Sequence, residues 1–194
     1  MNFLAHIYLS GDNELIRIGN FMADGIRGRD FENYSPDIKK GILLHRAIDS
    51  FTDAHPIFRQ GTKRLHSKFH HFSGVVLDVF YDHFLAKNWA VYSNDKLEDY
   101  VDTFYRSLDA NYSMLSQKTK NLLPIMKQYN WLVSYATLEG ISAILSQMDS
   151  RSGNKSLMRF APVSLIESYL LFEEEFTIFF EDLRYMASKK VLEL

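Results

Sequence analysis

The chain contains no cysteine, which excludes disulfide bonds, thiolate nucleophiles and thiolate metal ligands. It has no apolar run approaching the roughly 20 residues of a membrane helix, and its first residues lack the basic leader and apolar stretch of a secretory signal. A net charge of −2 argues against general nucleic-acid binding by the whole protein. We therefore expect a cytoplasmic protein that binds neither nucleic acid nor membrane; the composition leaves its oligomeric state open.

Several common catalytic motifs are also missing. The sequence has no glycine-rich phosphate loop, no His-Glu-x-x-His zinc helix and no Gly-x-Ser-x-Gly nucleophile turn. Any chemistry must therefore come from other groupings of acidic, basic and histidine side chains.

Proline and glycine are scarce and fall mostly where helices would begin or end, with four and nine residues respectively. Ser35-Pro36-Asp37 predicts a helix start, with Ser35 as the cap, and this helix should reach about Asp53. An earlier helix ends near Gly25 and Gly28, and further helices are predicted at 57–71, 74–92, 95–109, 114–128, 130–148 and 162–188. The first residues, FLAHIYLS, form a helix or an extended lead-in, and 149–155 a loop. The pattern predicts an all-α, single-domain helical bundle spanning residues 1–194.

The helix predicted from residue 74 combines burial with acidity. Apolar side chains surround almost its whole circumference, yet Asp78 and Asp82 lie four residues apart on one face. Burying ionised carboxylates without a partner is costly, so the pair requires a cation. That cation is either an arginine or lysine in a salt-bridge network, or a metal ion.

The segment HRAIDSFTDAH adds a second acidic stripe. His45, Asp49 and Asp53 follow one another at four-residue steps, each rotated only about 40° from the last. An imidazole and carboxylates suit Mn²⁺, Mg²⁺, Fe²⁺ or Zn²⁺. Asp53 is equally well explained as a turn residue before Pro56, and Arg46 could hold a phosphate oxygen or neutralise one of the acids.

Asp24 closes the earlier helix in GNFMADGIRG, where an acid opposes the helix dipole and gains no local stability. Arg27 lies between Gly25 and Gly28, which would let the backbone approach a ligand closely. Asp-Gly is also an ordinary turn pair. His6 lies in an apolar stretch, where a histidine is commonly a hydrogen-bonded core residue.

Residues 59–71 are basic and contain no acid. Their cations should lie mostly on one side of a helix: Arg59, Lys63, Arg64 and Lys68. This side is either an ordinary solvated face or a docking surface for an acidic partner. His66, His70 and His71 lie in the same segment, which favours such a face over a metal site.

Four segments carry a family resemblance: MNFLAHIYLS, GNFMADGIRG, GILLHRAIDSFTDAHP and LDVFYDHFLAKNW, in this order within the first 90 residues. In these segments the chain resembles bacterial acyl carrier protein phosphodiesterases. The resemblance implies a divergent, HD-domain-like phosphohydrolase that binds a divalent metal through His and Asp. It also implies Mn²⁺-supported hydrolysis of the phosphodiester between 4′-phosphopantetheine and a serine of acyl carrier protein. The usual His-Asp doublet is absent, since Asp82-His83 is its reverse.

These observations lead to a working hypothesis for the site. The predicted metal ligands are Asp24, His45, Asp49, Asp78 and Asp82, holding Mn²⁺, with Mg²⁺ or Fe²⁺ as alternatives. Arg27 and Arg46 would neutralise the phosphodiester, and His83 or His6 would protonate the departing serine oxygen. The basic side of residues 59–68 would dock the acidic carrier protein. The alternatives are an HD-like phosphohydrolase acting on a nucleotide or another small phosphodiester, and a non-catalytic helical binding protein.

Overall fold

The computed structural model describes residues 1–194 and contains helices without strands, which confirms the predicted all-α fold. The α-helices are α1 Phe3–Tyr8, α2 Glu14–Met22, α3 Pro36–Ala54, α4 Pro56–Phe69, α5 Ser73–Lys87, α6 Trp89–Tyr92, α7 Leu97–Ala110, α8 Gln117–Gln128, α9 Trp131–Ser134, α10 Leu138–Arg151, α11 Ala161–Glu167 and α12 Tyr169–Glu193. Short 3₁₀ turns join several of them: η1 Ala23–Gly25, η2 Asp30–Asn33, η3 His70–Phe72, η4 Tyr112–Met114 and η5 Met158–Phe160.

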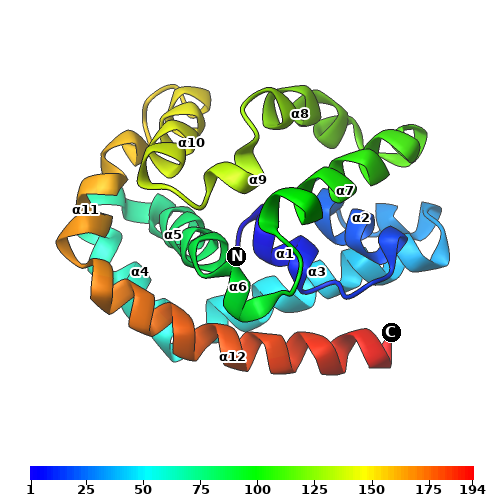
Figure 1. Ribbon diagram of the computed structural model, residues 1–194, viewed down its shortest axis with the longest axis horizontal. Coiled ribbons are helices and arrows are strands. Elements are labelled where there is room, and N and C mark those ends of the chain that lie inside the picture. Colours follow the sequence, from blue (N-terminus) through cyan, green and yellow to red (C-terminus); the bar gives the residue numbers. More distant parts are fainter.

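Helix α5 lies at the centre of the bundle. Helices α1, α4, α10 and α12 all pack against it, and α12 runs along one edge of the molecule (Figure 1). Nearly all apolar side chains of α5 are buried, as its sequence predicts, because neighbours cover it on several sides. Together α1, α3 and α5 bring the start of the chain next to the acids predicted as ligands.

Three predicted long helices are each divided in two. Asn88 separates α5 from α6, residues 135–137 separate α9 from α10, and Ser168, with φ −133° and ψ 32°, separates α11 from α12. These breaks carry no proline or glycine, so helical periodicity alone does not reveal them. Conversely, α8 continues through Pro124, and the side chain of Ser35 makes no capping hydrogen bond to α3.

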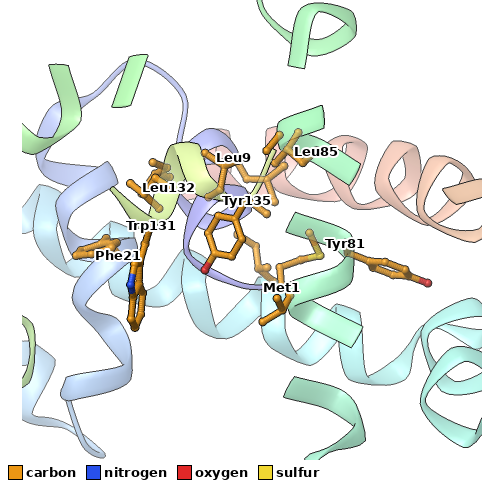
Figure 2. Close-up of a cluster of buried hydrophobic side chains, with 14 of the residues drawn as sticks. Met1, Leu9, Phe21, Tyr81, Leu85, Trp131, Leu132 and Tyr135 are labelled. Atoms are coloured by element: carbon orange, nitrogen blue, oxygen red, sulfur yellow. The ribbon is translucent and has the colours of Figure 1, made fainter. Parts of the chain in front are cut away.

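One contiguous core contains 50 buried hydrophobic residues. Figure 2 shows that Met1 lies in the same cluster as Tyr81 and Tyr135, so the beginning of the chain is part of the interior. The structure contains no helix that combines the length and the hydropathy needed to span a bilayer.

Helices α2 and α3 approach each other closely through glycine. A Cβ atom on Gly41 would meet the carbonyl oxygen of Ile16 and the amide nitrogen of Asn20, and one on Gly19 would meet the carbonyl oxygen of Ile38. Because glycine has only a hydrogen atom in place of a side chain, the backbones of α2 and α3 can approach to this short distance. This contact matters for the site described next, because α2 carries Asn20 and α3 carries His45 and Asp49.

We predict that Gly41→Ala lowers the free energy of unfolding by about 2 kcal/mol or more, because the methyl group pushes α2 away from α3. Chemical denaturation followed by circular dichroism measures the effect. Gly74→Ala is the matched control, since an added Cβ there meets nothing within 4 Å and alanine favours the helix. Equal stability of both variants would contradict the close contact.

Candidate metal centre

A cavity of about 310 Å³ lies where α1, α3 and α5 meet. Polar and charged side chains make up much of its wall. Its lining residues are Met1, Asn2, Phe3, His6, Phe21, Asp24, His45, Asp49, Thr52, Asp53, Val75, Asp78 and Met148. Four acids and two histidines thus face one small space.

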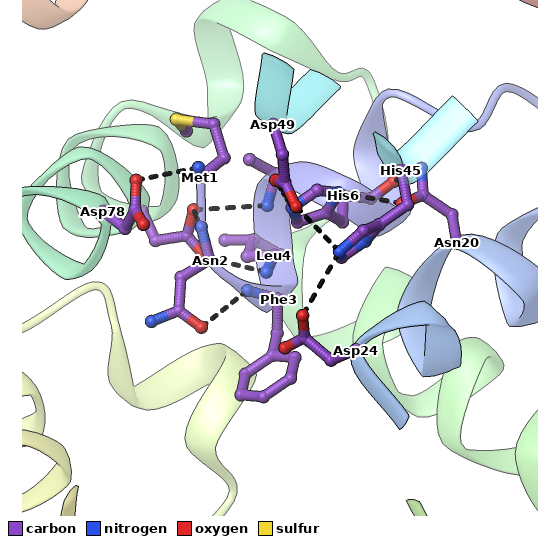
Figure 3. Close-up of polar contacts among 12 residues, drawn as sticks. Met1, Asn2, Phe3, Leu4, His6, Asn20, Asp24, His45, Asp49 and Asp78 are labelled. Carbon is purple, nitrogen blue, oxygen red and sulfur yellow. Dashed lines mark hydrogen bonds and ion pairs between the residues drawn. The ribbon is translucent and has the colours of Figure 1, made fainter. Parts of the chain in front are cut away.

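His6, His45 and Asp49 form the centre of this site (Figure 3). Nε2 of His45 is 3.0 Å from Oδ2 of Asp49, one turn further along α3, and Nε2 of His6 is 3.3 Å from Oδ1 of the same carboxylate. The two imidazole rings stack with their centroids 4.1 Å apart. Each residue offers one ligand atom, and these atoms lie within 4.8 Å of one another, so the group could hold a metal ion.

Asn20, buried on α2, orients both rings. Its Nδ2 donates to the carbonyl oxygen of His6 at 2.9 Å and to Oγ of Ser10 at 2.9 Å, which assigns the amide orientation. Its Oδ1 therefore accepts from Nδ1 of His6 at 2.8 Å and from Nδ1 of His45 at 3.2 Å. With a proton on Nδ1, each ring directs Nε2 toward Asp49, and the neutral form of the ring offers the Nε2 lone pair to an ion. This arrangement is typical of metal-binding histidines.

The charges of the group depend strongly on one another. Burial, and next the nearby His45, lower the pKa of His6 to about 4. Burial by itself would lower the pKa of His45, but hydrogen bonds to Asp24 and Asp49 raise it to about 9. The hydrogen bond from His45 lowers the pKa of Asp24 to about 2. Burial opposes ionisation of Asp49, yet its bonds to both histidines hold its pKa far below the usual range.

Asp24 stands at the exposed side of the group. Its Oδ1 is 3.3 Å from Nε2 of His45, so the acid at the end of α2 does reach the stripe on α3. Lys118 of α8 lies beside it, with Nζ 3.7 Å from Oδ2 of Asp24 and donating to the Asp24 carbonyl oxygen at 3.3 Å. The structure thus places a lysine at this end of the site, which the sequence pattern did not indicate.

The acids of α5 have other partners. Asp82 accepts hydrogen bonds from the backbone amides of Asn2, Leu4 and Ala5 at 3.2, 2.7 and 3.4 Å, so it caps α1. Asp78 pairs with the amino group of Met1 at 2.8 Å (Figure 3). A cation was predicted for the two acids, either an arginine or lysine or a metal ion. In the structure Asp78 has the amino group of Met1 as its cation, and Asp82 has neutral backbone amides instead. Asp78 still lines the cavity, whereas Asp82 does not.

The residues predicted to assist catalysis, other than His6, lie away from the cavity. Nδ1 of His83 donates to the carbonyl oxygen of Tyr135 at 2.8 Å, and its Nε2 accepts from the hydroxyl of Tyr169 at 2.7 Å. Arg46 donates to the carbonyl oxygen of Gly28 at 2.8 Å, and Arg27 is exposed. None of these three predicted residues lines the cavity. His83 has a hydrogen-bond partner within the fold on each ring nitrogen.

The four cations of the basic segment have two kinds of surroundings: two pair with acids of the same chain, and two line a recess. Arg64 makes a bidentate pair with Glu175 of α12 at 2.9 and 2.6 Å, and Lys68 bonds to Glu167 of α11 at 2.9 Å. Arg59 and Lys63 instead line a recess of about 610 Å³ that has no apolar residue in its wall. We call it the basic recess; the rest of its lining is Thr62, His66, Ser67, His70, Ser73 and Gly74. It adjoins the cavity, because Gly74 and Val75 are consecutive and Nε of Arg59 donates to the Asp53 carbonyl oxygen.

Besides Lys118, further polar residues of the site were missed in the sequence, among them Asn20 and Thr52. Asn20 is the only polar side chain between Ile18 and Met22, and such an isolated amide on an apolar helix is a signal for a buried hydrogen-bonding role. Thr52 lines the cavity, and its Oγ1 is buried without a hydrogen-bond partner. Nothing in its sequence neighbourhood distinguishes it from an ordinary helix residue.

Comparisons with known proteins agree with this picture. Residues 1–183 match the family model described as acyl carrier protein phosphodiesterase. The proteins of that name from Pectobacterium atrosepticum and Escherichia coli O157:H7 are 30% and 32% identical over 193 residues, covering 99% of this chain and 100% of each relative. The one from Photorhabdus laumondii is 29% identical over 191 residues, covering 98% and 96%.

No solved structure matches the chain, so the predicted likeness to HD-domain proteins stays a prediction. The family match, in contrast, extends well beyond the four segments that first indicated it and includes His6, Asn20, Asp24, His45 and Asp49. The chain belongs to the acyl carrier protein phosphodiesterase family.

Proposed function

We propose that this protein is a metal-dependent phosphodiesterase that hydrolyses holo-acyl carrier protein to apo-acyl carrier protein and 4′-phosphopantetheine. Water adds to phosphorus, the bond between phosphorus and the serine oxygen breaks, and a proton passes to that oxygen. Family membership supports the substrate. The observation that carries the metal-dependent chemistry is the convergence of His6, His45 and Asp49 in one cavity.

The side chains present fit a divalent ion. The two Nε2 atoms and the Asp49 carboxylate would hold it, and Asp24 is near enough to His45 to join them. Mixed imidazole and carboxylate ligands suit Mn²⁺, with Fe²⁺ and Mg²⁺ as alternatives. When bound, such an ion withdraws electron density from a phosphoryl oxygen and makes a bound water more acidic.

The chain's own residues position the substrate and the ligands. Asn20 accepts from Nδ1 of both imidazoles, so the neutral form of each ring offers Nε2 to an ion. The unpartnered hydroxyl of Thr52 is available to donate to a phosphodiester oxygen in the cavity. Lys118 pairs with Asp24 at the exposed side of the site. Like Arg27 and Arg46 it does not line the cavity, so neutralisation of the phosphodiester by a cation of this chain stays a prediction.

The direct test is incubation of the purified protein with holo-acyl carrier protein and Mn²⁺, with mass spectrometry of the carrier. Loss of the prosthetic group, dependent on the ion and blocked by a chelator, supports the proposal. Hydrolysis of nucleotides or small diesters without action on the carrier would instead indicate a general phosphohydrolase. Absence of any turnover together with absence of a bound ion would indicate a binding protein.

Asp49→Asn should reduce turnover of holo-acyl carrier protein by about a thousandfold and abolish stoichiometric metal binding, because the amide cannot replace the carboxylate shared by both histidines. Inductively coupled plasma mass spectrometry measures the ion. Asp102→Asn is the control, since Asp102 lies exposed on α7 and pairs only with Arg106. Full metal content in Asp49→Asn would remove this residue from the ligand set.

Asn20→Ala should weaken metal affinity about 10- to 100-fold, because both imidazoles lose the acceptor that fixes them. Isothermal titration with Mn²⁺ measures the affinity, and helical circular dichroism checks that the fold remains. Unchanged affinity in a folded variant would show that packing alone orients the rings.

We further propose that the basic recess docks the acidic carrier protein beside the cavity. It replaces the patch first predicted, since Arg64 and Lys68 are already paired within the chain and Arg59 and Lys63 are not paired with an acid. No acid lines the recess, and it borders the cavity at Gly74 and Val75. A complementary patch of this kind mainly increases the rate of productive encounter.

Lys63→Glu should therefore raise KM for holo-acyl carrier protein about tenfold and flatten its dependence on salt, without changing turnover of bis(p-nitrophenyl) phosphate. Steady-state kinetics with both substrates separates docking from chemistry. Lys96→Glu, an exposed lysine before α7, serves as the control for net charge. Equal effects of both substitutions on KM would contradict a specific role for the recess.

A further inference from the structure

No other helix of the fold covers the outer face of α12. This helix of 25 residues runs along one edge of the molecule, with the remainder of the bundle on its inner side (Figure 1). The inner face buries Phe172, Phe176, Phe179, Phe180 and Leu183. The outer face is therefore free to meet another molecule along its whole length.

Apolar side chains form a stripe on that outer face. Leu171, Ile178, Tyr185 and Leu192 recur every seven residues and are 42, 53, 68 and 83% exposed. A seven-residue step drifts by only about 20° on a straight helix, so these side chains stay on one side. Scattered exposed apolar residues are common, but an aligned set indicates an interaction surface.

The charges of α12 are separated along its length. Between residues 173 and 182 all charged side chains are acidic; Glu173 and Glu175 pair with Lys87 and Arg64 of the same chain, and the exposed acids are Glu174, Glu181 and Asp182. Between residues 183 and 194 the chain carries Arg184, Lys189 and Lys190 against the single acid Glu193. A parallel neighbour of the same sequence would place like charges together, whereas an antiparallel one can place exposed Glu174 beside Lys189 of the second copy.

We propose that α12 is the contact surface of a homodimer, in which two copies pack this helix antiparallel about a two-fold axis between residues 181 and 182. A single register then aligns three pairs: Leu171 with Leu192 of the second copy, Ile178 with Tyr185, and Glu174 with Lys189. Two-fold symmetry forms each pair twice, as a self-complementary interface requires. Exposed Glu174 has no partner within its own chain.

The acids at the axis do not oppose this arrangement. Glu181 accepts from Arg184 at 2.8 Å, and Asp182 lies 3.2 Å from Nε2 of His55, so each already has a neighbouring basic group. Hollows flank Tyr185 on both sides, one toward Tyr8 of α1 and one toward Phe51 of α3, and they offer space for side chains of the second copy. A membrane surface fits this helix poorly, because half of it is acidic.

Sedimentation velocity across the micromolar range tests the proposal on the full chain. Wild type should sediment as a dimer, and Glu174→Lys or Lys189→Glu alone should weaken association about tenfold or more, since each breaks two symmetric pairs and adds repulsion. The double variant E174K/K189E restores opposite charges and should regain the dimer. Tyr129→Asp, at an exposed aromatic on the end of α8, is the control.

Cysteine cross-linking tests the register, because the chain has no cysteine of its own. The double variant L171C/L192C should oxidise to a covalent dimer, whereas L171C alone should not, since its two copies lie about 32 Å apart along the axis. A monomeric wild type, a dimer indifferent to the charge substitutions, or efficient cross-linking of L171C alone would each overturn the proposal. None of these residues lines the metal cavity, so loss of the dimer is distinguishable from loss of hydrolysis.

Discussion

The whole site depends on how the two carboxylates of α5 are satisfied. Asp78 and Asp82 lie on the central helix, where an unpartnered charge would be strongly unfavourable. Their donors are the amino group of Met1 and the backbone amides that begin α1. These contacts hold the start of the chain against α5, and His6 lies only one turn further along. The acids thus influence the candidate metal centre by holding His6, one of its possible ligands, in position.

A second constraint comes from the narrow spacing of α2 and α3. Glycine at positions 19 and 41 lets the backbones meet, and the short distance brings the amide of Asn20 within hydrogen-bond range of His45. The same amide reaches His6 on α1, so one side chain links three helices. Close backbone packing and hydrogen bonds from Asn20 therefore together hold the candidate ligands in position.

The features that could be predicted from the sequence are those that depend on residues close together in the chain. The helical fold and the His45–Asp49 stripe follow from spacing within one helix, and the structure contains both. Asp24 was predicted to belong to the site because an acid at the C-terminal end of a helix gains no local stability. In the structure it lies beside His45. The need of Asp78 and Asp82 for partners was also inferred, but helical spacing does not reveal which donors a distant segment supplies. The pairing of Arg64 with Glu175, 111 residues away, was likewise beyond such reasoning.

The shortness of α1 has a consequence for assembly. Six residues are too few for a helix that is stable by itself in water, so α1 owes its shape to the acceptor that Asp82 provides and to the core around it. His45 and Asp49, in contrast, share one long helix. A partly folded chain with α3 formed but α1 detached would hold only half of the chelating group. Under the proposed metal-dependent function, tight binding of an ion would therefore require α1 to be docked, and metal binding would be coupled to completion of the tertiary structure.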